Sequence, residues 1–151
     1  MKRQTDLPLL GYINKYGCFF MSMVYWFSLK TRQVDLDYKA LNTLWDEAIR
    51  QGAISGDMNG DGDMNDADES LIMNKDLLLK IAALRLKYVG SFPPDRVIKL
   101  PGNLYVGEFY NERTKFTHFV ALDDDFKVEY DPIMNSVTAR EGVLKTVRVF
   151  S

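Results

Sequence analysis

The sequence predicts an α+β domain in which N-terminal helices pack on a C-terminal antiparallel sheet. Long apolar segments and helix-capping residues fill the first half of the chain, whereas the second half holds short aromatic and β-branched segments between turn residues. Helices first and strands afterwards is the order typical of α+β domains. A chain of 151 residues suits one domain, so we expect a single domain over 1–151 with a loop insertion at 57–69.

An apolar segment from Tyr16 to Phe27 predicts a central helix, expected over about 17–29. Its apolar residues fall on every side of a helix, which indicates a helix buried all round. Cys18, the only cysteine of the chain, would lie in its first turn. The positive end of the helix dipole and the free N–H groups there stabilise a thiolate relative to a thiol.

A second helix is expected over 38–51, with Asp37 as its N-cap and Gly52 at its C-terminal end. Its apolar residues recur three and four positions apart, which indicates an amphipathic helix with one face on the core. These residues are Leu41, Leu44, Trp45, Ala48 and Ile49.

A third helix is expected over 75–88, with Asn74 as its N-cap. A single helix that starts inside the preceding acidic loop is the alternative. Gly90 and the Pro93–Pro94 pair end the helical half of the chain.

Four strands follow, and two of them place a histidine opposite an acid. The strands are expected at 103–110, 115–122, 126–131 and 143–150. A two-residue turn at Asp124–Asp125 would pair Asp123 with Phe126. That register puts His118 directly opposite Asp131, at the ~4.5–5.5 Å between Cβ atoms that lets a carboxylate orient an imidazole.

Composition excludes several classes of protein. The apolar fraction of 46% is that of a globular chain, and the bases are scattered, so we expect no nucleic-acid partner. A lone cysteine excludes an internal disulfide and a Cys-rich zinc site. We find no signal peptide, lipoprotein signal or membrane-spanning segment, so we expect a soluble protein, cytoplasmic by default, with no membrane partner.

The segment from Asp57 to Asp68 predicts a calcium-binding loop. Oxygen-bearing side chains occupy its first, third, fifth, ninth and twelfth positions, and glycine occupies the sixth, where the coil needs positive φ. The seventh residue would offer its main-chain carbonyl. The expected ligands are Asp57, Asn59, Asp61, Asp63, Asn65 and Asp68. This spacing resembles the EF-hand-like loops of dockerin modules.

Charge favours a bound Ca²⁺ over the alternative, a solvated loop of Asp, Asn and Gly. Residues 57–69 carry six acids and no base, and without a cation these acids would repel one another. One difference from the standard EF-hand is the shorter carboxylate of Asp68 at position twelve, with Glu69 one place late. A single loop rather than a pair indicates a structural role for the ion.

Cys18 has one histidine, His118, as a possible partner. A cysteine at a helix start, a histidine on a strand and an acid that orients the imidazole make up the site of a thiol hydrolase. Each residue can also be explained without catalysis, as a buried core cysteine, a structural histidine and an Asp131–Pro132 turn. Their order and the predicted hairpin favour a Cys18, His118, Asp131 triad.

This order resembles the papain-like superfamily of cysteine peptidases, and above all the bacteriocin-processing peptidases. In those enzymes a strand that begins with His leads through a hairpin to Asp-Pro; the matching segments here are His118–Leu122 and Val128–Pro132. Transglutaminase-like domains share the same order. The resemblance implies a papain-like fold, with Cys18 as nucleophile, His118 as general base and then acid, and Asp131 as the orienting carboxylate.

One position departs from that family. Papain-like enzymes usually carry a glutamine, an oxyanion donor, about six residues before the nucleophile. Tyr12 stands there in this chain, and Asn14 is the nearest amide. The Tyr12 hydroxyl and the Cys18 backbone N–H are further donors, so the sequence assigns no oxyanion hole.

The sequence therefore predicts a cysteine hydrolase, a peptidase or amidase with a peptide or amide substrate, stabilised by calcium. The alternative is a non-catalytic calcium-binding interaction module on a papain-like fold. A dockerin-like docking module is a third option, which the single loop and the length of the chain disfavour.

Overall fold

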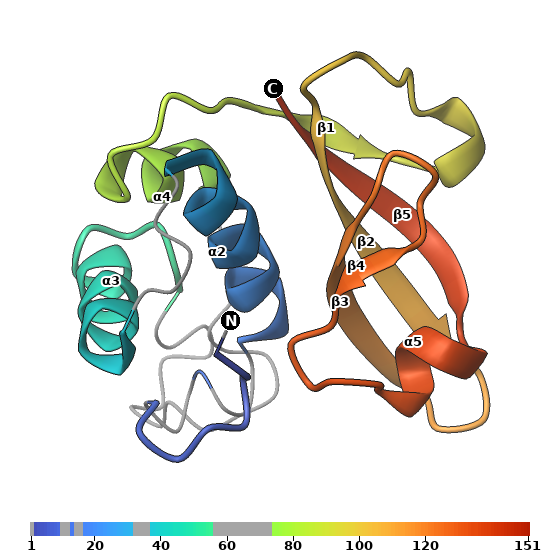
Figure 1. Ribbon diagram of the computed structural model, residues 1–151, viewed down its shortest axis with the longest axis horizontal. Helices are drawn as coiled ribbons and strands as arrows, with labels where there is room; N and C mark the ends of the chain where they lie inside the picture. The colour runs from blue at the N-terminus through green and yellow to red at the C-terminus, as the bar shows by residue number, and fades with distance from the viewer. Residues whose placement is uncertain (1, 10–12, 14–16, 32–36, 56–73) are drawn as a thin grey trace.

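The computed structural model describes residues 2–9, 13, 17–31, 37–55 and 74–151, and its fold is α+β (Figure 1). The helices are α2 (Cys18–Thr31), α3 (Tyr38–Arg50), α4 (Lys75–Ile81) and α5 (Val137–Glu141), with a short 3-10 turn, η1 (Pro94–Arg96). The strands are β1 (Tyr88–Phe92), β2 (Leu104–Asn111), β3 (Phe116–Leu122), β4 (Val128–Tyr130) and β5 (Val143–Phe150). The predicted order of helices before an antiparallel sheet is confirmed.

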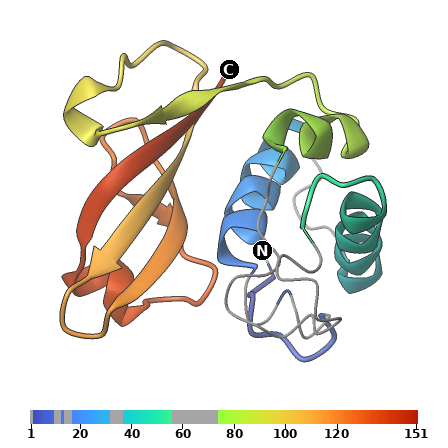
Figure 2. The ribbon, with the colours of Figure 1, turned by 180° about the vertical axis from the view of Figure 1, so that it is seen from behind.

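Helix α2 is the central element: it lies between the sheet on one side and α3 and α4 on the other (Figures 1 and 2). Its side chains explain this position, because Phe20, Met21 and Val24 are buried. Phe20 meets Trp45 of α3 edge to face, and Phe19 meets Phe119 of β3, with ring centroids 5.0 Å apart in each pair. The apolar segment therefore joins the two halves of the fold.

Local capping signals set the ends of α3, as predicted. Asp37 is the N-cap, and its carboxylate accepts a hydrogen bond from the backbone N–H of Ala40 at 2.7 Å. At the other end Gly52 has φ +78°, the left-handed conformation that a glycine adopts without strain after a helix.

Helix α4 is shorter than predicted. Asn74 caps it by accepting from Leu77 N–H, as expected, but the helix ends at Ile81 rather than at residue 88. Ala83 has φ +57°, which ends the helix, and Tyr88 begins β1 instead. The Leu-rich and Ala-rich composition of this segment favoured helix, yet pairing with β5 decides the structure of its end.

The sheet is antiparallel with the strand order β1-β5-β2-β3-β4. Strands β2, β3 and β5 match the predicted segments, whereas β4 is confined to three residues. Helix α5 was not predicted, because its five residues give too short a pattern.

The predicted hairpin register is wrong. The loop has three residues rather than two: Phe126 adopts φ +63°, its N–H bonds Asp123 O, and Asp123 N–H bonds Lys127 O. Leu122 consequently pairs with Val128, and a further irregularity pairs Ala121 with Tyr130. His118 is therefore not a ladder partner of Asp131, although the two side chains meet beyond the end of β4.

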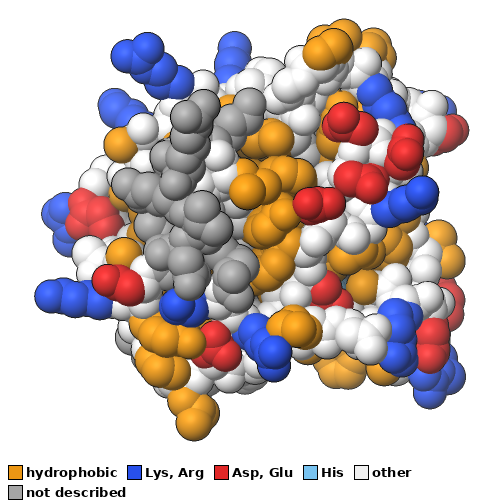
Figure 3. Space-filling model, viewed as in Figure 1, with side chains coloured by type: hydrophobic (Ala, Val, Ile, Leu, Met, Phe, Trp, Pro, Cys, Tyr) orange, Lys and Arg blue, Asp and Glu red, His pale blue; other side chains and the backbone are white. Residues whose placement is uncertain are grey.

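Among the described residues, two apolar clusters pack against the sheet. One unites α2, α3 and α4 with side chains of β2 and β5, and includes Val106 and Phe150. The other lies among Tyr105, Val120 and Val147, with Ala139 of α5 packed against it. Figure 3 shows hydrophobic side chains gathered down the middle of one face, beside the atoms drawn in grey. Among the described residues no helix is long and apolar enough to cross a membrane.

Candidate catalytic site

Cys18 lies in the first turn of α2, as predicted; it is the first residue of the helix and is partly exposed. The residue before it is fixed by close packing: a Cβ on Gly17 would lie 2.4 Å from Ile13 O. No side chain fits there, so a glycine is needed to bring the chain into α2. Ser22, one turn further on, donates to Cys18 O at 2.8 Å and lies within 3.1 Å of Phe119 O on β3. The first turn of α2 is thus attached to the strand that carries His118.

His118 lies on β3, in the part of the strand that does not pair with β4. Among the described residues β4 pairs only with Ala121 and Leu122, so the chain after β4 passes beside the start of β3 as a turn. The imidazole is buried, with 4% of its side-chain surface exposed. A buried imidazole needs polar partners, and the turn after β4 provides one.

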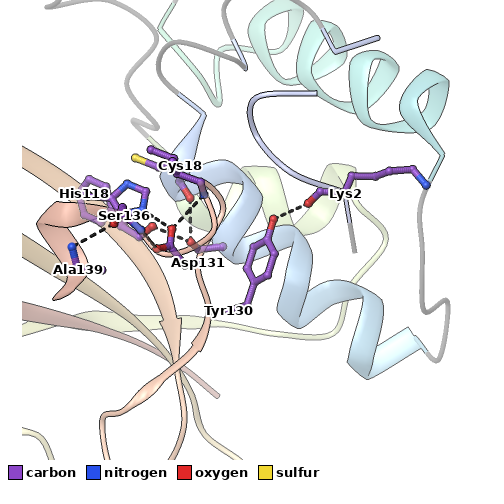
Figure 4. A network of polar contacts seen from close by, with 10 residues as sticks. Lys2, Cys18, His118, Tyr130, Asp131, Ser136 and Ala139 are labelled. Atoms are coloured by element: carbon purple, nitrogen blue, oxygen red, sulfur yellow. Dashed lines mark hydrogen bonds and ion pairs between the residues drawn. The ribbon is translucent and has the colours of Figure 1, made fainter. Parts of the chain in front are cut away.

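Asp131, in that turn, is the partner. Its Oδ1 lies 2.7 Å from His118 Nε2, and the side chain is 8% exposed. The carboxylate also accepts from the backbone N–H groups of Ile133, at 3.0 Å, and Ser136, at 2.7 Å. Ser136 in turn caps α5 through Ala139 N–H (Figure 4). One carboxylate therefore fixes both the imidazole and the turn that leads into α5.

These contacts set the charges of the pair. Burial opposes charge on His118, but its hydrogen bonds with Asp131 and Cys18 outweigh burial and raise its pKa from 6.5 to about 9. Burial likewise opposes charge on Asp131, and the bonds from His118, Ser136 and Ile133 lower its pKa to about 2. At neutral pH the site holds a carboxylate and an imidazolium.

Cys18 is the third member of this group. It lies beside His118 in Figure 4, and its thiol is one of the groups that raise the pKa of the imidazole. Because Asp131 occupies Nε2, the nitrogen left for the thiol is Nδ1. The structure therefore brings Cys18, His118 and Asp131 together, although the register from which Asp131 was predicted is wrong.

No family model, no curated protein and no solved structure matches this chain. The geometry of its own side chains therefore carries the functional argument.

A cavity of about 380 Å³ opens onto the thiol and the imidazole. The described residues that line it are Gln4, Cys18, Phe116, Thr117, His118, Ile133, Ser136, Val137 and Thr138. The N-terminal segment reaches this cavity because Gln4 N–H bonds Pro132 O at 2.9 Å and Tyr130 OH bonds Lys2 O at 2.7 Å. Gln4 is buried, with 3% of its surface exposed.

Sequence reasoning missed Gln4 and Ser136. Gln4 lies fourteen positions before Cys18 in a segment without periodicity, and no local signal marks it. Ser136 did carry a signal, since serine before a short helical segment is a favoured N-cap.

Several predicted residues lie outside the described part of the chain. Tyr12 and Asn14, considered as oxyanion donors, are among them, and so are all six predicted calcium ligands, Asp57, Asn59, Asp61, Asp63, Asn65 and Asp68. Within the described ranges no group of three or more His, Cys, Asp and Glu side chains could hold a metal ion.

Proposed function

We propose that this protein is a cysteine hydrolase, a peptidase or amidase of papain-like type. The observation that carries the proposal is the imidazole of His118, buried between the carboxylate of Asp131 and the thiol of Cys18. A buried His–Asp pair that points its second nitrogen at a cysteine is costly to build for packing alone. It has the arrangement that activates a thiol nucleophile.

The residues would act as a thiolate–imidazolium pair. Cys18 Sγ bonds to the substrate carbonyl carbon, and His118 donates its Nδ1 proton to the amine as the C–N bond breaks. Water then attacks the thioester while His118 accepts its proton, and the carboxylic acid leaves as the C–S bond breaks and the thiolate re-forms beside the imidazolium. Asp131 keeps Nε2 protonated and the ring oriented throughout.

Gln4 is our candidate oxyanion donor. A tetrahedral intermediate on Cys18 needs N–H donors beside the sulfur, and the amide of Gln4 is buried in the same cavity. Loss of one such donor typically lowers kcat by ~10²–10³-fold. We expect Gln4→Ala to do so while Cys18 remains reactive towards iodoacetamide. An unchanged kcat would remove Gln4 from the mechanism.

The test is a peptide-library digest followed by mass spectrometry. The protein should cleave a subset of peptides, and Cys18→Ser should abolish every cleavage with its far-UV circular dichroism unchanged, because serine is nearly isosteric. Cleavage that persists in Cys18→Ser would contradict the proposal. If neither protein cleaves and Cys18 is inert to alkylation, the non-catalytic calcium-binding module takes its place.

We also propose that Ca²⁺ binds the loop from Asp57 to Asp68. The loop's oxygen spacing supports this, and the described residues at its base close it: Asn74 N–H bonds Ala53 O at 3.1 Å. Because the loop lies between α3 and α4 in sequence, an ion bound to it in the folded state would stabilise the folded protein. At a hundredfold excess over Kd, binding to the folded state alone stabilises by ~2.7 kcal/mol.

Thermal melts with calcium and with chelator test this second proposal. We expect calcium to raise Tm in the wild type and to have no effect in Asp61→Ala. Asp124→Ala, in the exposed hairpin loop, is the matched control and should keep the calcium response. An equal response in both variants, or no response at millimolar calcium, would rule out this site.

A further inference from the structure

The cavity beside Cys18 has an apolar wall. Phe116, Ile133 and Val137 line it, and they remain 68%, 41% and 38% exposed. Large apolar side chains left in water are unfavourable unless something covers them. They come from three separate elements, β3, the turn after β4 and the first turn of α5, and so surround one cavity rather than one helix face.

The described residues of the same lining carry no charge other than that of Cys18 and His118. Of the nine described residues that line the cavity, only Cys18 and His118 can ionise, and the other polar groups are neutral amides and hydroxyls. A charged ligand group would lose its hydration there without gaining an opposite charge. The lining therefore suits an uncharged apolar group.

The wall is held by the residue that orients the imidazole. Asp131 accepts the backbone N–H groups of Ile133 and Ser136, which fixes Ile133 directly and Val137 through the cap of α5. On β3, Phe116 lies two residues before His118 and on the same face of the strand. The apolar wall and the nucleophile thus keep a fixed relation to each other.

We propose that this wall is a specificity subsite that takes an uncharged apolar group next to the reacting carbonyl of the substrate. The inference rests on the proposed hydrolase function and adds its substrate class. Peptides or amides with a bulky aliphatic or aromatic group beside the scissile bond would be preferred over those with a charged or small polar group there. These substrates are preferred because their apolar group moves out of water and onto the side chains of Phe116, Ile133 and Val137.

Thiol-reactive probes test this without a known substrate. The second-order rate of Cys18 alkylation by N-benzyl chloroacetamide is compared with that by N-(2-hydroxyethyl) chloroacetamide, each divided by its rate with glutathione. We expect the benzyl probe to be favoured about tenfold, the discrimination typical of a small apolar contact. Its rate should also saturate with concentration, because a bound complex precedes alkylation.

A pair of substitutions locates the effect. Ile133→Thr combined with Val137→Thr makes the wall polar; the second is isosteric and the first removes one methyl group. The double variant should reduce the ratio of the two rates to near one. Val143→Thr is the matched control, because Val143 is 58% exposed but does not line the cavity, and it should keep the wild-type ratio.

The outcomes separate the two proposals. A wild-type ratio near one, or an undiminished ratio in the double variant, overturns the subsite while the hydrolase proposal stands. Failure of every probe to alkylate Cys18 in the folded protein overturns both.

Discussion

The helical half and the sheet half of this protein acquire their structure in different ways. Helices α3 and α4 begin at side-chain caps, Asp37 and Asn74, that act within one turn of chain. The sheet half depends on contacts between residues distant in sequence, and bulges interrupt three of its four strand pairings. Local signals could therefore locate the helices, whereas the register of the sheet depends on the assembled fold.

The candidate site lies where these halves meet. Cys18 belongs to the helical half, whereas His118 and Asp131 belong to the sheet half. Polar bonds join the halves around it: Ser22 Oγ to Phe119 O, Trp26 Nε1 to Tyr105 O, and Gln4 N to Pro132 O. The distance between thiol and imidazole thus depends on how α2 docks, while the His118–Asp131 contact depends on the sheet half alone.

The largest effect on stability is expected from Asp131→Ala. Removal of the carboxylate leaves a buried imidazole and two backbone N–H groups without their acceptor. Loss of one partner of a buried ion pair typically costs ~3–5 kcal/mol in free energy of unfolding. Urea denaturation measures it.

Asp123→Ala is the matched control on the same hairpin. Its carboxylate also accepts two backbone N–H groups, from Asp125 and Lys127, but in an exposed loop. We expect Asp123→Ala to lower the free energy of unfolding by about 1 kcal/mol. If both variants lost the same free energy of unfolding, the contact between His118 and Asp131 would contribute nothing beyond the hydrogen bonds of the turn.

Titration of the same pair should limit stability at both ends of the pH range. The pKa of Asp131 is about 2 in the folded protein against 3.8 ordinarily, so its contribution is complete above 3.8 and lost as pH falls through 2. The pKa of His118 is raised from 6.5 to about 9, so its contribution is complete below 6.5 and lost as pH rises through 9.

The free energy of unfolding should therefore be greatest between about pH 4 and 6.5. In Asp131→Asn the neutral amide cannot stabilise the imidazolium. The free energy of unfolding should therefore fall less steeply at both low and high pH. A pH profile identical to that of the wild type would show that these two groups do not control it.

A smaller effect is expected from Gly17→Ala, on the helical side of the site. The added Cβ would meet Ile13 O at 2.4 Å, and a backbone atom cannot rotate away. Overpacking of this kind costs ~1–3 kcal/mol and should also displace Cys18 from His118. Leu29→Ala, at an exposed position on the same helix, is the control. If both variants had the same Tm as the wild type in thermal melts, the close packing at Gly17 would be contradicted.

Much of the fold could be predicted because its signals are local. The apolar α2, the capped start of α3 and the last strand follow from periodicity and capping chemistry. Strand β1 was missed because its helix-favouring neighbours hide a segment that pairs with distant β5. Helix α5 was missed because five residues give too short a pattern.

The candidate site was predicted for a reason that is only partly right. Cys18 and His118 follow from being the only thiol and the only imidazole of the chain. Asp131 was placed by a register that the left-handed Phe126 alters, and it reaches His118 from a turn instead. Gln4 could not be predicted, since only the folded chain brings the N-terminal segment to the cavity.

The central claim is that the imidazolium of His118 activates the thiol of Cys18. The most direct test is the rate of Cys18 alkylation by iodoacetamide at pH 6.5, relative to glutathione, in the folded wild type and in His118→Ala. A paired thiolate should react about tenfold faster than an ordinary thiol, which is largely protonated at that pH. We predict fast labelling in the wild type and its loss in His118→Ala. Equal rates in the two proteins, or labelling only after unfolding, would contradict the account.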